Sequence, residues 1–184
     1  MYIRKMIFLS CLALLLFCAG AAAEASEIAL MSVGQSPDAM MVRVVLRKMK
    51  VESDYDSMFG AKDLAGQKVL IAVIGGSSKG LGAAGIDKEE EMARARAVFD
   101  AAKSKDIRIL VMHVGGEGRR GELSDFFVEG AVPYGEKLIV VKGGNNDGII
   151  ERLKKAEASI VTADKIQETQ EPLAEVLREW GVTF

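Results

Sequence analysis

Val69-Leu-Ile-Ala-Val-Ile74 leads directly into Gly75-Gly-Ser-Ser-Lys-Gly-Leu-Gly-Ala-Ala-Gly85, so that an apolar run ends in a glycine-rich loop. The run contains no polar residue, whereas a strand with one face in water alternates apolar and polar residues. Continuous hydrophobicity therefore predicts a strand of a parallel sheet that is covered by helices on both faces. The glycine-rich loop is then expected at the carboxyl edge of that sheet.

Similar apolar runs recur along the chain. Strong runs lie at residues 28–33, 107–112 and 137–141, and weaker runs lie at residues 51–55 and 159–162. The amphipathic segments between these runs are expected to be helices that cover the sheet.

Several residues mark where these helices begin and end. Pro37 precedes a helix predicted over residues 38–50, and Asp87 is expected to cap a helix whose first turn is acidic. Further helix starts are predicted at Ser124, Asp147 and Pro172, and Gly181 is predicted to end the last helix. The buried stripe of the first helix is predicted to contain Met41, Val44, Val45 and Met49, and Met40 is also placed at a core position.

The alternation of strands and helices predicts one three-layer α/β domain over residues 24–184. Its sheet is expected to be open, doubly wound and mostly parallel, flavodoxin-like or Rossmann-like, with five to six strands. Right-handed crossovers favour the strand order 2-1-3-4-5, with the weak sixth strand at the edge.

The first residues are typical of a secretory signal peptide. Arg4 and Lys5 precede an apolar run at residues 6–18, and three alanines at residues 21–23 provide a cleavage site. The sequence thus predicts a signal peptide over residues 1–23 and an exported chain, periplasmic or extracellular; an uncleaved or lipid anchor remains an alternative. Cleavage would remove both cysteines, Cys11 and Cys18, so no disulfide is expected.

Composition excludes several classes of protein and partner. The chain has 24 basic and 26 acidic residues, 49% hydrophobic residues and a single histidine. This is the profile of a globular domain, and the mildly acidic balance argues against a nucleic-acid partner. No cofactor and no zinc site are expected, while a hard-cation site built from Asp38, Glu117 and Asp147 stays open.

Glycine distribution indicates a candidate ligand site. Thirteen of the 19 glycines fall in the loops after the four strong strands, and these loops should open at one edge of the sheet. Glycines there let main-chain N–H groups approach a ligand, and the basic residues between them favour an anion. The candidate ligand-binding residues are Gln35, Ser36, Asp38, Gly76, Ser77, Ser78, Lys79, Gly80, His113, Gly115, Gly116, Glu117, Arg119, Arg120, Asn145 and Asn146.

The loop after the second strong strand also matches two catalytic patterns. Residues 80–85 fit the dinucleotide fingerprint G-x-G-x-x-G, but they follow the wrong strand for that fold. Residues 76–80 fit the nucleophile pattern G-x-S-x-G, which allows a secreted serine hydrolase with Ser78 as nucleophile and His113 as base. That pattern requires a helix directly after the serine, whereas we expect the helix to begin at Asp87.

Three motifs resemble a known family, the exported bacterial proteins grouped as domain of unknown function 6305. They lie at residues 34–38, 75–86 and 113–125, and the resemblance extends over nearly all of the chain after the signal peptide. It implies export and one α/β domain, and it implies no particular activity.

The sequence as a whole predicts an extracytoplasmic binding protein for a small anionic metabolite, a carboxylate or a phosphate. Backbone amides of residues 76–79 and 115–118 would hold the anion, with Lys79, Arg119 or Arg120 as counter-charge. Such a protein could deliver its ligand to a membrane-protein partner. Besides the hydrolase, a structural or partner-binding envelope protein is the remaining alternative. The oligomeric state is not predicted.

Overall fold

The computed structural model describes residues 26–184, and the predicted signal peptide lies outside this range. Six parallel strands form one sheet in the order β2-β1-β3-β4-β5-β6, which confirms the predicted doubly wound topology and strand order. The strands are β1 (Ile28–Val33), β2 (Asp54–Tyr55), β3 (Val69–Ile74), β4 (Arg108–His113), β5 (Lys137–Val141) and β6 (Ser159–Ala163).

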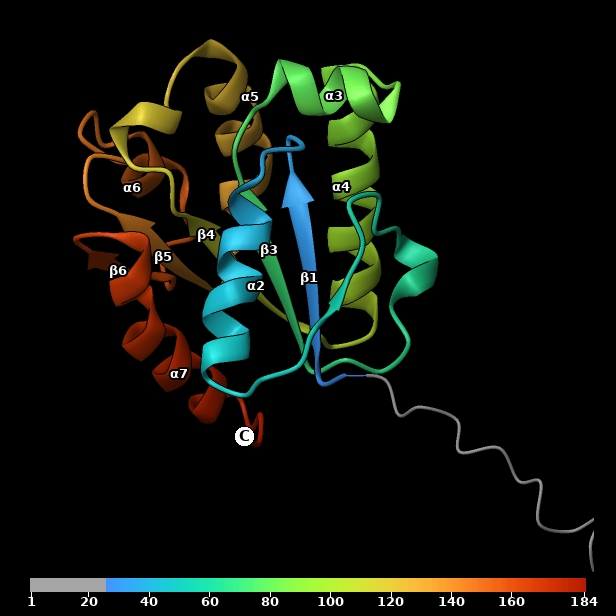
Figure 1. The fold of residues 1–184 in the computed structure, drawn as a ribbon, viewed down its shortest axis with the longest axis vertical. Helices are drawn as coiled ribbons and strands as arrows, with labels where there is room; N and C mark the ends of the chain where they lie inside the picture. The colour runs from blue at the N-terminus through green and yellow to red at the C-terminus, as the bar shows by residue number, and fades with distance from the viewer. Residues whose placement is uncertain (1–25) are drawn as a thin grey trace, which may run out of the picture.

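Helices cover both faces of the sheet, as continuous strand hydrophobicity requires (Figure 1). One face carries α2 (Asp38–Lys48) and α7 (Gln170–Glu179). The other face carries α4 (Lys88–Ser104), α5 (Glu122–Ala131) and α6 (Ile149–Leu153). The short helix α3 (Ser78–Ala84) lies at the carboxyl edge of the sheet, next to the start of α4. Four 3₁₀ helices complete the described chain at Ala61–Asp63, Glu117–Arg119, Val132–Tyr134 and Ile166–Thr169.

The predicted helix signals hold to within a few residues. Asp87 caps α4 through a capping box, in which its carboxylate accepts a hydrogen bond from Glu90 N at 2.7 Å and Glu90 Oε2 accepts one from Asp87 N at 3.0 Å. The starts predicted at Ser124, Asp147 and Pro172 correspond to α5, α6 and α7, respectively. Within residues 26–184, no helix has the length and apolarity required to cross a membrane.

The predicted buried face of α2 is only partly correct: Val45 is buried and Met49 packs partly buried against the core, but the other predicted residues are exposed. Met41 and Val44 are 46% and 51% exposed, and Met40 is exposed as well. Residues 39–42 and 44–46 are all apolar, so periodicity alone does not select a face. The residues that turn toward the sheet are Ala39, Val42, Val45 and Leu46.

Candidate functional site

The loops after β1, β3, β4 and β5 lie next to one another at the carboxyl edge. Gln35 and Gly76 form an isolated antiparallel bridge between the first two loops. A Cβ added to Gly115, after β4, would lie 3.2 Å from Asp38 Oδ2, and one added to Gly143, after β5, would lie 3.0 Å from Glu117 N. These glycines permit close packing between loops that belong to four different strands.

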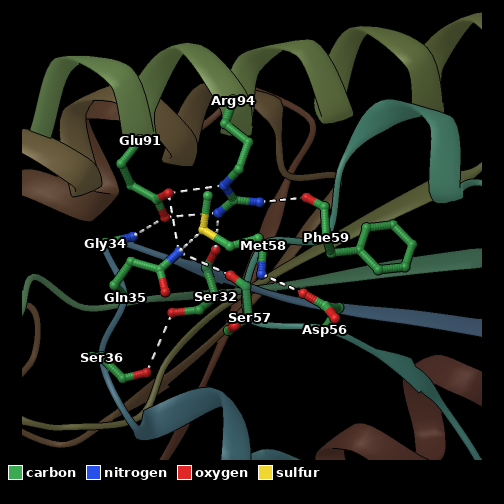
Figure 2. A network of polar contacts seen from close by, with 10 residues as sticks. All are labelled: Ser32, Gly34, Gln35, Ser36, Asp56, Ser57, Met58, Phe59, Glu91 and Arg94. Carbon is green, nitrogen blue, oxygen red and sulfur yellow. Dashed lines mark hydrogen bonds and ion pairs between the residues drawn. The ribbon is translucent and has the colours of Figure 1, made fainter. Parts of the chain in front are cut away.

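A buried ion pair fixes the loop after β1 (Figure 2). Glu91 on α4 is fully buried and accepts a hydrogen bond from Gly34 N at 2.9 Å. Arg94, one helical turn later, donates to both Glu91 carboxylate oxygens at 2.7 and 2.8 Å and to the Ser32 carbonyl oxygen at 2.7 Å. The pair thus ties α4 to the end of β1.

Gln35 belongs to this network, which explains its strained backbone. Its φ of 58° lies in the left-handed region, which is uncommon for a residue other than glycine. Its side-chain amide nitrogen, Nε2, donates to Glu91 Oε2 at 3.1 Å and to the Ser57 carbonyl oxygen at 2.9 Å. These bonds offset the cost of the backbone conformation and hold the residue that bridges to Gly76.

Two of the hollows at this edge share Arg119 as a lining residue. The first, called here the helix-end hollow, has a volume of about 300 Å³ and is lined by Gly76, Ser78, Gly118, Arg119, Arg120, Gly121, Glu122, Leu123 and Ser124. The second, called the serine hollow, has a volume of about 570 Å³ and is lined by Ser32, Gln35, Ser36, Pro37, Tyr55, Ser57, Ser77, Lys79, Gly80, Ala83 and Arg119. Most of the predicted ligand residues after β1, β3 and β4 therefore surround one divided depression.

The helix-end hollow lies between the first turns of α3 and α5. The first amides of any helix lack an intrahelical acceptor. Within residues 26–184, the backbone amides of Ser78, at the start of α3, and of Leu123 and Ser124, at the start of α5, donate to no protein acceptor. Gly121, which precedes α5, has no side chain that could cap it. Gly76 N, in contrast, is satisfied by Ser124 Oγ at 3.0 Å. The dipoles of both helices place positive potential in this hollow.

The two neighbouring arginines have different environments. Arg120 donates to Asp125 at 2.7 Å, to both Asp147 oxygens at 3.1 and 2.9 Å, and to the Gly144 carbonyl oxygen at 2.7 Å. These bonds lower the pKa of Asp147 to about 2 and raise the pKa of Arg120. Arg120, one of the three predicted counter-charges, is therefore already neutralised by two carboxylates.

Arg119 is more weakly paired. Its Nε lies 3.5 Å from Asp38 Oδ1, and its side chain is partly exposed. Asp38 is only 3% exposed, and its Oδ2 has no hydrogen-bond partner within residues 26–184. Of the two arginines, Arg119 is thus the one whose guanidinium retains hydrogen-bonding capacity toward a ligand.

His113 is buried at the end of β4. Its Nε2 lies 3.4 Å from the Arg119 carbonyl oxygen, and its Nδ1 has no partner within the described residues. Burial lowers the pKa of the imidazole below its ordinary value of 6.5. The ring is therefore held neutral beneath the Arg119 loop.

This environment predicts a pH dependence of stability. A depressed pKa in the folded state means that the unfolded chain binds the proton more tightly. The contribution of His113 should be complete above about pH 6.5 and should be lost as the pH falls toward the lower folded pKa. Because the chain has one histidine, His113→Gln should flatten the stability profile between about pH 7 and 5.5, as measured by urea denaturation. An unchanged slope would contradict this origin.

Ser78 and His113, the predicted nucleophile and base, are not brought together within residues 26–184. A helix does begin at Ser78, with Ser77 as its cap, so the expectation that the next helix starts only at Asp87 was wrong. The helix forms here because Ser77 Oγ accepts a hydrogen bond from Gly80 N at 3.0 Å. This cap stabilises the first helical turn although the segment contains glycines. However, Ser78 is exposed, His113 is buried, and no hydrogen bond joins them within residues 26–184.

The remaining predicted residues lie outside the divided depression. Glu117 and Asn146 line a third hollow of about 210 Å³ beside Arg120 and Asp147. Asn145 instead caps α6, since its Oδ1 accepts a hydrogen bond from Ile150 N at 2.8 Å. Residues 26–184 contain no cluster of three or more metal-ligating side chains, so Asp38, Glu117 and Asp147 do not form the hard-cation site that the sequence left open.

Sequence reasoning missed the roles of Glu91, Arg94 and Ser124 in holding the loops at the carboxyl edge. Glu91 was read only as an acidic residue of the first helical turn. A signal was present, because Glu91 is four residues before Ala95 and seven before Val98, on the stripe that α4 buries. A carboxylate on a buried stripe, followed by an arginine three residues later, indicates an internal ion pair.

Fold and site together define a three-layer α/β protein with polar hollows at the carboxyl edge of its sheet. The chain belongs to the family "Domain of unknown function (DUF6305)", whose model matches residues 25–177. No curated protein matches the chain. One similar solved structure is a mutant of the esterase AlinE4, with 12% identity, 83% of this chain and 94% of that chain covered, and a TM-score of 0.32. This likeness carries no argument about activity.

Proposed function

We propose that this protein binds a small anionic metabolite, a carboxylate or a phosphate, outside the cytoplasm. The anion would lie in the helix-end hollow, between the first turns of α3 and α5, with Arg119 as counter-charge. Export is inferred from the signal-peptide pattern of residues 1–23.

The observation that carries this proposal is the environment of Arg119. Arg119 lines the same hollow as Ser78, Leu123 and Ser124, whose backbone amides lack protein acceptors within residues 26–184. Backbone N–H groups at helix starts together with an arginine form a suitable environment for an anion. The neighbouring Arg120 already forms ion pairs with Asp125 and Asp147. We therefore assign the positive charge that would bind the anion to Arg119.

The serine hollow gives the ligand room beyond its acidic group. It adjoins the helix-end hollow at Arg119 and is lined by Ser36, Ser77 and Lys79, of which Lys79 is exposed. A ligand that extends past Arg119 into this space would orient through hydroxyl hydrogen bonds. The two volumes favour a small metabolite over a polymer.

Thermal melting against a panel of carboxylates and phosphates tests the proposal. A ligand at 100 times its dissociation constant should stabilise the protein by about 2.7 kcal/mol. Arg119→Gln should weaken binding by about 1.5–3 kcal/mol, since a charge-assisted hydrogen bond is lost. Arg47→Gln is the matched control, because Arg47 is exposed at the end of α2. Equal affinity in wild type and Arg119→Gln, or no stabilisation by any member of the panel, would contradict the proposal.

Ser78→Ala separates binding from hydrolysis. In a binding protein the loss of this hydroxyl should cost about 0.5–1.5 kcal/mol of affinity. The purified protein should show no turnover of carboxylic esters above background, with or without Ser78. Ester turnover that Ser78→Ala abolishes would instead establish the hydrolase.

A further inference from the structure

A different part of the molecule, the outer edge of the sheet at β6, has features of an interface between two copies of the chain. Within residues 26–184, β6 pairs with β5 on one side and has no strand on the other (Figure 1). An unpaired edge presents a row of free N–H and C=O groups.

The register shows which residues carry these free groups. Lys142 N donates to the Ala163 carbonyl oxygen at 2.8 Å, so the polar groups of Ala163 face β5. Successive residues of a strand direct their N–H and C=O groups to opposite sides. Ile160 and Thr162 therefore direct theirs outward, and within residues 26–184 no acceptor or donor meets them.

The edge also lacks the features that normally prevent strand pairing. Exposed edges are usually protected by lysine, proline or bulges. β6 reads Ser-Ile-Val-Thr-Ala, with no charge and no proline, and three of its five residues are β-branched. Val161, at the centre of β6, is 36% exposed. It lies between Ile160 and Thr162, the two residues whose backbone groups are free.

The sequence of this edge is complementary to itself in the antiparallel direction. A two-fold axis at Val161 places Ile160 of each copy opposite Thr162 of the other copy. The outward N–H and C=O groups of Ile160 then hydrogen-bond to those of Thr162 at two symmetric positions. The same axis brings Glu157 of one copy near Lys165 of the other. Both side chains are exposed, and Lys165 also pairs at the surface with Glu168 of its own chain at 3.1 Å, so the charge pair between copies adds register specificity and little affinity.

We propose that two copies of the chain pair antiparallel through β6, with Val161 on the two-fold axis, to form one continuous sheet. The ligand hollows lie at the carboxyl edge and remain open in this arrangement. The inference goes beyond the proposed anion binding and does not depend on it.

Cross-linking tests the register. In the proposed pairing the two Val161 Cα atoms form a non-hydrogen-bonded pair about 4.5 Å apart, within reach of a disulfide. Two Thr162 residues are diagonal neighbours, about 7–8 Å apart and beyond that reach. In full-length chains carrying Cys11→Ser and Cys18→Ser, Val161→Cys should yield a covalent dimer as the main oxidised product, and Thr162→Cys should not. Equal cross-linking of both variants, or of neither, would overturn the proposal.

Sedimentation measures the association itself. The wild-type protein should sediment as a dimer, and Thr162→Pro should sediment as a monomer because it removes an outward N–H group and no bond to β5. Thr162→Ala keeps that group and should remain dimeric. Thermal melts of both variants show whether Thr162→Pro is folded; if it is not, the Val161→Cys cross-link decides alone. A monomeric wild type at every concentration, or a dimer that persists in folded Thr162→Pro, would overturn the proposal.

Discussion

Glu91→Ala is expected to lower the free energy of unfolding by about 3–5 kcal/mol, the usual cost of removing one partner of a buried ion pair. The substitution would leave the Arg94 guanidinium, mostly buried, without its carboxylate. It would also deprive Gly34 N of its acceptor and Gln35 Nε2 of one of its acceptors, and thereby loosen the loop after β1. Chemical denaturation of the two proteins measures the difference.

Glu89→Ala is the matched control for this prediction. Glu89 lies in the same helical turn but is exposed, and its ion pair with Lys88 spans 3.8 Å at the surface. Exposed pairs contribute about 0–1 kcal/mol, so this substitution should have little effect. Similar losses in both variants would show that Glu91 acts through helix propensity and the helix dipole instead of the buried pair.

Gly80→Ala and Gly82→Ala should change stability in opposite directions, although both lie in α3. A Cβ at Gly80 would lie 2.0 Å from the Gln35 carbonyl oxygen, and the Glu91–Arg94 network holds that backbone in place. Overpacking of this kind costs about 1–3 kcal/mol or more. A Cβ at Gly82 meets no atom within 4 Å, so Gly82→Ala should gain about 0.5–1 kcal/mol from helix propensity.

Urea denaturation of the two variants checks this prediction. It also tests the contact between the loops after β1 and β3, because Gly80 is close-packed only if that contact exists. Two effects of the same sign would show that Gln35 does not lie against α3 as described.

The sheet was predictable from the sequence because one physical constraint determined it. Strands such as β1 and β3 are buried on both faces, so every residue along them is apolar or small. This pattern can be recognised without knowing which residues the strands contact. Their order then followed from crossover handedness. The buried face of α2 was not predictable, because apolar residues surround most of the helix and only contact with the sheet distinguishes Val42 from Val44.

The sequence predicted where the candidate site lies, but it did not predict the role of each residue in it. Glycine-rich loops after successive parallel strands must meet at one edge, which brought Gly76, Ser78 and Arg119 together. The sequence could not separate Arg119 from Arg120, because Asp147, which accepts from Arg120 through both carboxylate oxygens, lies 27 residues along the chain. Asp125, the nearer partner, is five residues away on α5. A long-range ion pair such as Arg120–Asp147 leaves no local pattern.

The most direct test of the anion site is the backbone amide spectrum of the ¹⁵N-labelled protein during titration with inorganic phosphate, acetate or citrate. We predict that at least one of these anions shifts the amide resonances of Ser78, Leu123 and Ser124 along a common saturation curve, and that Arg119→Gln weakens the curve. A hollow at the amino ends of the strands, lined by residues that include Lys103 and Lys137, is the rival place for an anion. Unchanged resonances at the three amides with all three anions, or shifts confined to this second hollow, would contradict the site.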